Sequence, residues 1–142
     1  MIEAIVNTET LKRSARGSIT GELFLRSAGE DFPDRHWSDF PVVVLAWWIN
    51  GLRKVVVGRE DSYVGDFMDG PYAFVVKRTE GDVGQIAWCR DDEEIHGGNI
   101  DVYAFQQSVV SAAQSIAAAC HANGWSSADL ENLEQAIAQN AA

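Results

Sequence analysis

Carboxylates are the side chains of this sequence whose number and spacing could do chemistry. Residues 91–94 form an uninterrupted run of two Asp and two Glu, and Asp66 and Asp69 flank a predicted turn. Acid–base catalysis needs two carboxylates at a fixed separation in unlike environments, and neighbouring loop acids seldom meet this condition. A solvated loop is the commonest role of such a run. A docking surface for a basic partner is the other role that the pattern allows.

Cysteine and histidine provide the other chemically active side chains. The candidates for metal ligands or nucleophiles are Cys89, His96, Cys120 and His121, but no C-x-x-C or H-x-x-x-H pair occurs. Adjacent helical residues such as Cys120 and His121 point about 100° apart. No G-x-S-x-G nucleophile elbow and no phosphate-binding glycine loop is present. We therefore expect no catalytic residues, no metal and no cofactor, although a Cys–His or Ser–His pair formed only in space stays open.

The charge of the chain is unevenly distributed. The 142 residues carry a net charge of -10, yet residues 1–60 hold eight basic and eight acidic side chains. Residues 61–142 hold three basic and thirteen acidic side chains. Proteins that bind nucleic acid neutralise its phosphates with clustered Lys and Arg. We therefore expect no nucleic-acid partner, and a basic protein is the better match.

Length and hydrophobicity indicate one domain that spans residues 1–142. The longest apolar run, Pro41–Ile49, has nine residues, whereas a membrane-spanning helix needs about 20. The first residues lack the charged start and long apolar core of a signal peptide. Two cysteines are too few for a disulfide framework and fit a reducing compartment. We expect a cytoplasmic protein with no membrane partner.

Alternating β-branched and aromatic residues predict several strands, bounded by Gly, Asp and Pro. An Asp-Gly pair at positions 69–70 lies between two such runs and indicates a hairpin, although Pro71 alters the usual two-residue turn. The expected strands are Ile2–Leu11, Glu22–Arg26, Tyr63–Met68, Tyr72–Lys77 and Val83–Arg90, and the expected polar loops are Asp31–Trp37 and Asp91–Asn99.

The segment after Trp37 favours a helix. Ser38 or Asp39 can accept hydrogen bonds from free N–H groups at its start, and Pro41 is tolerated in a first turn. Apolar residues at steps of three and four continue to Val55. Three consecutive valines would also suit a buried strand. The length of the segment and the residues at its start favour the helix over the strand.

Two further helices are predicted near the C-terminus. Asp101 caps the first, whose apolar stripe ends at Gly124. Ser126 and Asp129 form a capping box that begins the second. The predicted fold class is therefore α+β, an antiparallel β meander covered by about three α-helices.

Three stretches of the sequence, together with the Ala-rich segment before Gly124, resemble a known group of small bacterial proteins. They are similar to the immunity proteins of polymorphic-toxin systems, which include contact-dependent growth inhibition systems. The resemblance implies a cytoplasmic inhibitor that binds a cognate toxin domain and blocks its active site or its access to substrate. Because immunity proteins have no catalytic motif, the resemblance implies no catalytic residues in this chain. The stretches are Phe32-Pro33-x-x-x-Trp37-Ser38-Asp39-Phe40-x-Val42, Leu45-x-Trp47-Trp48 and Phe67-Met68-Asp69-Gly70-Pro71-Tyr72.

Charge and resemblance together favour a non-enzymatic toxin inhibitor whose partner is a basic toxin domain, such as a nuclease. Exposed tryptophan or tyrosine beside acids would anchor such an interface. The alternatives are a small intracellular enzyme or ligand-binding module with a pocket between sheet and helices, and a subunit that self-associates through its aromatic residues. The expected partner-binding residues are Asp66, Asp69, Tyr72, Trp88, Asp91, Asp92, Glu93, Glu94 and Asp101.

Overall fold

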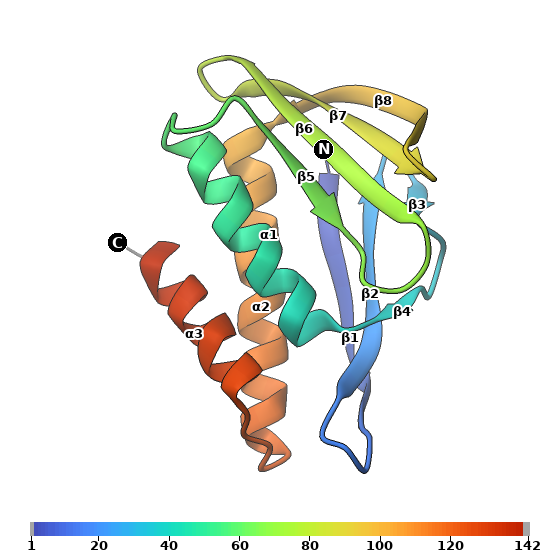
Figure 1. The fold of residues 1–142 in the computed structure, drawn as a ribbon, viewed down its shortest axis with the longest axis vertical. Coiled ribbons are helices and arrows are strands. Elements are labelled where there is room, and N and C mark those ends of the chain that lie inside the picture. The colour runs from blue at the N-terminus through green and yellow to red at the C-terminus, as the bar shows by residue number, and fades with distance from the viewer. Residues whose placement is uncertain (1, 141–142) are drawn as a thin grey trace.

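The computed structural model describes residues 2–140, which form two antiparallel sheets and three α-helices (Figure 1). The α+β class and the β meander predicted from the sequence are confirmed. Sheet A joins β1, β2 and β3 in that order, with β4 also paired to β2, and sheet B is the meander β5-β6-β7-β8. The strands are β1 (Ile2–Arg13), β2 (Ile19–Ser27), β3 (Glu30–Phe32), β4 (Ser38–Asp39), β5 (Ser62–Asp66), β6 (Tyr72–Glu80), β7 (Val83–Arg90) and β8 (Glu93–Asp101).

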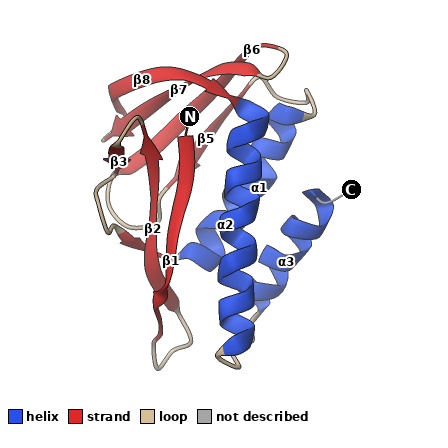
Figure 2. Ribbon diagram, turned by 180° about the vertical axis from the view of Figure 1, so that it is seen from behind, coloured by secondary structure: helices blue, strands red, loops and turns tan. Residues whose placement is uncertain are grey.

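The helices form a layer beside both sheets. They are α1 (Pro41–Val56), α2 (Val102–Ala122) and α3 (Ala128–Asn140). The view from behind shows sheet B crossing one end of this layer, while β1 runs beside α2 and β2 lies on the other side of β1 (Figure 2). Within the described residues, no helix has both the length and the apolar stretch needed to cross a bilayer.

A cluster of aromatic rings joins the helices to sheet B. Phe74 on β6 meets Trp48 of α1 with ring centroids 5.1 Å apart, and Phe105 of α2 at 5.4 Å. Trp48 also packs against Phe67 at 5.0 Å. All four side chains are buried. Edge-to-face pairs of this kind add about 1 kcal/mol each beyond the burial of their area, so the cluster fixes how sheet B lies on α1 and α2.

The prediction of a polar loop over Asp91–Asn99 is wrong, because Glu93–Asp101 forms a strand, β8. Asp91 and Asp92 form a two-residue turn with φ values of 53° and 65°. The turn brings Glu93 opposite Arg90, and β8 then pairs with β7 along its length. Glycines and acids have low β propensity, but hydrogen bonding to a neighbouring strand overrides that weak preference.

The prediction for the start of α1 is confirmed in part, because Asp39 accepts a hydrogen bond from an N–H group there but neither Ser38 nor Asp39 is the N-cap residue. The N-cap residue is Phe40, and it makes no side-chain capping bond. Pro41 occupies the first turn, as predicted. The Asp39 carboxylate accepts a hydrogen bond from the Phe40 N–H, and it serves three further donors outside the helix.

Of the cap predictions for the other two helices, the one for α2 is confirmed and the one for α3 is wrong. The Asp101 carboxylate accepts a hydrogen bond from the Ala104 N–H at 2.9 Å, so Asp101 caps α2. At α3 the hydroxyl of Ser127, rather than Ser126, accepts from the Leu130 N–H at 3.1 Å. The capping side chain thus lies one residue later than predicted, because α3 begins at 128.

Candidate functional site

Six of the predicted partner-binding acids converge at one end of sheet B. Asp66 ends β5, and Asp69 lies in the loop from β5 to β6. The register pairs Tyr72 with Arg90 and Arg90 with Glu93, so the turn after β7 lies at the same end of the sheet. We call this surface the acidic end; its members are Asp66, Asp69, Asp91, Asp92, Glu93 and Glu94.

The acidic end is exposed and its charge is not neutralised locally. All six carboxylates belong to exposed residues, and none forms an ion pair with any other side chain that the structure describes. Arg90 lies at the same end of β7, but its guanidinium lies over the Tyr72 ring, 5.9 Å from the centroid. Unpaired charges of one sign create a local potential that attracts an oppositely charged partner.

One loop of the acidic end is held in place by a buried carboxylate. Asp39 is 1% exposed and accepts hydrogen bonds from the backbone N–H groups of Met68 at 3.1 Å and Asp69 at 3.2 Å. The same carboxylate accepts from the Phe40 N–H at 2.8 Å and from the Trp37 indole N–H at 3.0 Å. Sequence analysis missed this role, because the partners of Asp39 lie about 30 residues away and no local pattern marks them.

Of the other three predicted partner-binding residues, Tyr72, Trp88 and Asp101, only one lies at the acidic end. Tyr72 is half-buried at the acidic end, where its ring meets Trp37 and Phe32 edge to face. Trp88 is only 7% exposed and stacks on Phe32 with centroids 4.8 Å apart. Asp101 lies at the far end of β8, where it caps α2. The structure therefore brings Tyr72 to the acids but leaves Trp88 in the core and Asp101 at the opposite end.

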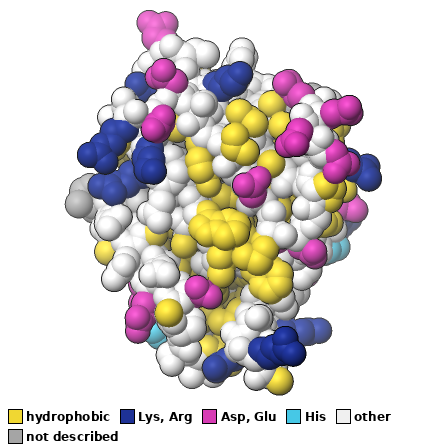
Figure 3. Space-filling view, viewed as in Figure 1, with side chains coloured by type: hydrophobic (Ala, Val, Ile, Leu, Met, Phe, Trp, Pro, Cys, Tyr) yellow, Lys and Arg dark blue, Asp and Glu magenta, His cyan; other side chains and the backbone are white. Residues whose placement is uncertain are grey.

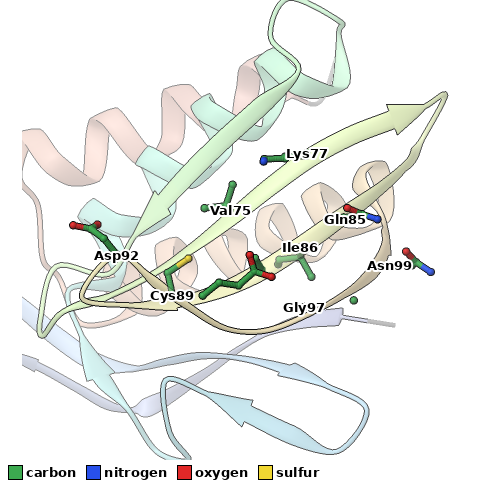
Figure 4. Close-up of a pocket in the computed structure, with 11 residues that line it drawn as sticks. Val75, Lys77, Gln85, Ile86, Cys89, Asp92, Gly97 and Asn99 are labelled. Atoms are coloured by element: carbon green, nitrogen blue, oxygen red, sulfur yellow. The ribbon is translucent and has the colours of Figure 1, made fainter.

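A groove runs along the face of sheet B that points away from the helices (Figure 4). Phe74 packs against α1 and α2, so its strand neighbour Val75 points to the other side. The groove has a volume of about 480 Å³. Its small floor residues include Val75, Ala87 and Gly97; Lys77, Gln85 and Asn99 line one part, and Cys89, Asp92 and Glu94 line the part next to the acidic end.

The thiol in this groove is a poor nucleophile. Burial raises the pKa of the Cys89 thiol above its usual value, and the charges of Glu94 and Asp92 raise it further. Burial and the charge of Glu134 likewise raise the pKa of Cys120, which is fully enclosed on α2. Because the thiolate is the reactive form, both side chains are mostly protonated at neutral pH. Neither thiol is therefore activated by its surroundings.

Neutralising the two groove acids should make Cys89 more reactive. In a D92N/E94Q variant the thiolate loses two destabilising charges, so the pKa of Cys89 falls and alkylation by iodoacetamide at pH 8 rises about threefold. The control variant D61N/D82N removes the same charge at the other end of sheet B and should react like the native chain. Equal rates in all three proteins would contradict the electrostatic role of Asp92 and Glu94.

The histidines and cysteines do not form an evident metal site. In the part of the chain that the structure describes, no three His, Cys, Asp or Glu side chains are grouped as metal ligands. His121 lies 3.1 Å from Glu134 on α3, and the side chain of His96 is outside the described part. Comparisons of the chain with protein-family models, with curated proteins and with solved structures found no match.

Proposed function

We propose that this protein is an immunity protein that binds a cognate bacterial toxin domain in the cytoplasm and blocks its active site or its access to substrate. The observation that carries the proposal is the acidic end, where six exposed carboxylates gather on the turns and strand ends of one sheet. Complementary charge accelerates encounter with a basic surface. A nuclease domain fits, because enzymes that hold nucleic acid present clustered Lys and Arg.

The groove beside the acidic end supports the same proposal. A Lys or Arg side chain of the partner can lay its aliphatic stem along Val75 and Ala87 and bring its cation to Asp92 and Glu94. Tyr72 adds an aromatic rim residue next to these acids. Charge then controls the rate of encounter, whereas a few well-packed contacts in the groove control dissociation.

The volume of the groove also favours a second candidate, a small-molecule binding module. About 480 Å³ falls within the range of ligand pockets. This groove, however, lies on the open face of the sheet, whereas the sequence-based alternative required a pocket between sheet and helices. A ligand that raises the melting temperature of the native chain but not of an A87W variant would favour this candidate.

The decisive experiment begins with the gene directly upstream. We expect it to encode a secreted protein with a C-terminal toxin domain, and co-expression of the present chain should rescue growth of cells that produce that domain. The purified domain should bind the chain directly, with an association rate that falls as salt is added. Failure of both rescue and binding would overturn the proposal.

A charge variant then tests the surface. Six units of negative charge are removed from the acidic end, and a control variant removes six units from the opposite end of sheet B. We expect the first variant to associate about tenfold more slowly at low salt, with a flatter salt dependence, and the control to keep most of the native rate. An unchanged rate in the first variant would place docking elsewhere. The variants are D91N/D92N/E93K/E94K and, as control, E60K/D61N/E80K/D82N; Asn is used at 91 and 92 because both residues have positive φ.

A further inference from the structure

The strand β8 forms an open edge of sheet B. In the part of the chain that the structure describes, β8 pairs with β7 alone. It has nine residues, whereas the edge strands β3, β4 and β5 have three, two and five. β1 is longer, but its free side faces α2, where the Ala4 N–H donates to the Ser108 hydroxyl at 2.9 Å. A long strand with one free side is a template for a strand of another chain.

The hydrogen bonds between β7 and β8 show which backbone groups of β8 are free. The Val102 N–H, directly after β8, donates to the Asp82 carbonyl at 2.8 Å. Because hydrogen-bonded positions alternate along an antiparallel pair, the even-numbered residues of this part of β8 bond β7. The N–H and C=O groups of Gly97 and Asn99 therefore point away from the sheet.

β8 lacks most of the features that protect an edge strand. Natural edges carry Lys or Pro, are covered, or are twisted away by a bulge. The sequence of β8, Glu93–Asp101, contains neither Lys nor Pro. Its register shift leaves Ile95 as an extra residue, and that side chain is 58% exposed. From Gly97 onward the register with β7 is regular, so this part of the edge can pair with another strand.

The free edge borders the groove on the open face of sheet B. Figure 4 shows Gly97 and Asn99 on the outermost strand of that groove. Gly97 lies in one cross-strand row with Ala87 and Val75. Side chains in such a row share a face of the sheet, so a residue of an added strand opposite Gly97 would point its side chain to the groove. Gly97 has no side chain that would block the way over Ala87.

A carboxylate lies over this position. A β-carbon at Gly97 would lie 3.3 Å from Oε1 of Glu94, so the Glu94 carboxylate is placed directly above Gly97 on the groove side. Glu94 forms no ion pair with another described side chain. A Lys or Arg opposite Gly97 would bring its cation to this carboxylate, where it can form a charge-assisted hydrogen bond.

The charge of β8 favours a basic segment over a second copy of the chain. No Lys or Arg follows Arg90, whereas Glu93, Glu94 and Asp101 belong to β8. In either direction, pairing two copies of β8 brings their acids together, and like charges on adjacent strands are destabilising. Figure 3 shows most of the Asp and Glu side chains in view at one side of the molecule, and Lys and Arg side chains gathered at the other. A basic segment is attracted both to β8 and to the acidic end beside it.

We propose that an extended segment of the toxin domain pairs with β8 as a fifth strand of sheet B, with a Lys or Arg opposite Gly97. In antiparallel pairing, Gly97 and Asn99 each exchange two hydrogen bonds with the segment. The main chain then supplies affinity, and the groove selects the basic side chain. This inference rests on the proposed function and adds to it the conformation of the bound segment and the position of its cation.

Amide hydrogen exchange of the native chain tests the pairing, with the purified C-terminal domain encoded directly upstream as the probe. We expect the amides of Gly97 and Asn99 to exchange at least about tenfold more slowly in the complex, because each becomes hydrogen-bonded. The control is the Val6 amide, two residues beyond Ala4 on the α2 side of β1, which should exchange at the same rate with and without the domain. A stable complex in which Gly97 and Asn99 exchange as fast as in the free chain would overturn the inference.

A proline at position 99 tests the same edge by mutation. Asn99→Pro removes an N–H that points away from β7, so it breaks no hydrogen bond within the sheet, and proline is tolerated at such positions of edge strands. We expect the dissociation constant of the complex to rise at least about tenfold with little change in melting temperature. The control, Asn99→Ala, keeps the N–H and should bind within about twofold of the native chain.

The outcomes separate this inference from the proposed function. If the upstream domain is neither bound nor neutralised, both are wrong. If the domain is bound and N99P binds it as tightly as N99A, only the strand pairing is wrong and toxin inhibition stands. Weaker binding by N99P than by N99A, together with slower exchange at Gly97 and Asn99, supports the pairing. The exchange measurement uses the native chain, so it decides the question even if N99P does not fold.

Discussion

Replacing Asp39 with alanine should lower the free energy of unfolding by about 3–5 kcal/mol. The buried carboxylate accepts four hydrogen bonds, from Phe40, Met68, Asp69 and the Trp37 indole, with lengths between 2.8 and 3.2 Å. Removing it leaves these donors without their acceptor in a buried site, which costs more than the bonds themselves contribute. Urea denaturation measures the loss.

Asparagine should rescue little of this loss. Each oxygen of the Asp39 carboxylate accepts two hydrogen bonds, and an Asn side chain would turn an NH₂ group toward two of the donors. The control is Asp61→Asn, on an exposed residue, which should change stability by less than about 0.5 kcal/mol. Hydrogen exchange of the Met68 and Asp69 amides should accelerate in D39A, since that loop loses its anchor. A loss under about 1 kcal/mol with both amides still protected would contradict the anchoring role.

Replacing Gly65 with alanine should destabilise the chain by about 2–3 kcal/mol. Gly65 pairs with Phe74 across β5 and β6, and a β-carbon at position 65 would overlap the carbons of the Phe74 ring. That ring cannot move aside, because Trp48 and Phe105 pack against it. The aromatic cluster that joins sheet B to the helices would have to shift.

The matched control is Gly98→Ala, which is also a glycine-to-alanine change in a strand of sheet B. A β-carbon at Gly98 meets no heavy atom within 4 Å, and Gly98 is not among the glycines with positive φ. The free energy of unfolding of Gly98→Ala should stay within about 0.5 kcal/mol of the native value or rise, because alanine restricts the conformations of the unfolded chain. Thermal denaturation of both variants makes the comparison, and equal melting temperatures would contradict the close packing at Gly65.

Local signals in the sequence were enough to predict most of the elements. The 3.6-residue periodicity and Pro41 located α1, and Asp101 located the start of α2 to the residue. The Asp-Gly pair at 69–70 located the turn between β5 and β6, although β5 ends at Asp66 and the loop is longer than predicted. Each of these signals acts between residues close in the chain.

The features that were missed depend on contacts between distant residues. β8 is a strand because β7 lies beside it, while its own glycines and acids indicate a loop. The hydrogen bonds from Met68 and Asp69 to Asp39 span 29 and 30 residues. The exposure of Trp47 and the burial of Trp48 follow from which side of α1 faces the core. Periodicity does not decide this when both neighbours are tryptophan.

The anchoring of the acidic loop by Asp39 has a consequence for how such a protein can evolve. Asp39 binds backbone N–H groups, so it holds positions 68 and 69 whatever side chains they carry, proline excepted. The turn at 91–92 is likewise closed by backbone pairing between β7 and β8. Side chains at positions 68 and 69 can therefore mutate while the scaffold keeps its shape, whereas the positive φ values at 91 and 92 restrict that turn to residues such as Asp, Asn and Gly. A lineage that carries this fold can acquire a preference for a new partner through a few point substitutions, without the loss of stability that changes in the core would cause.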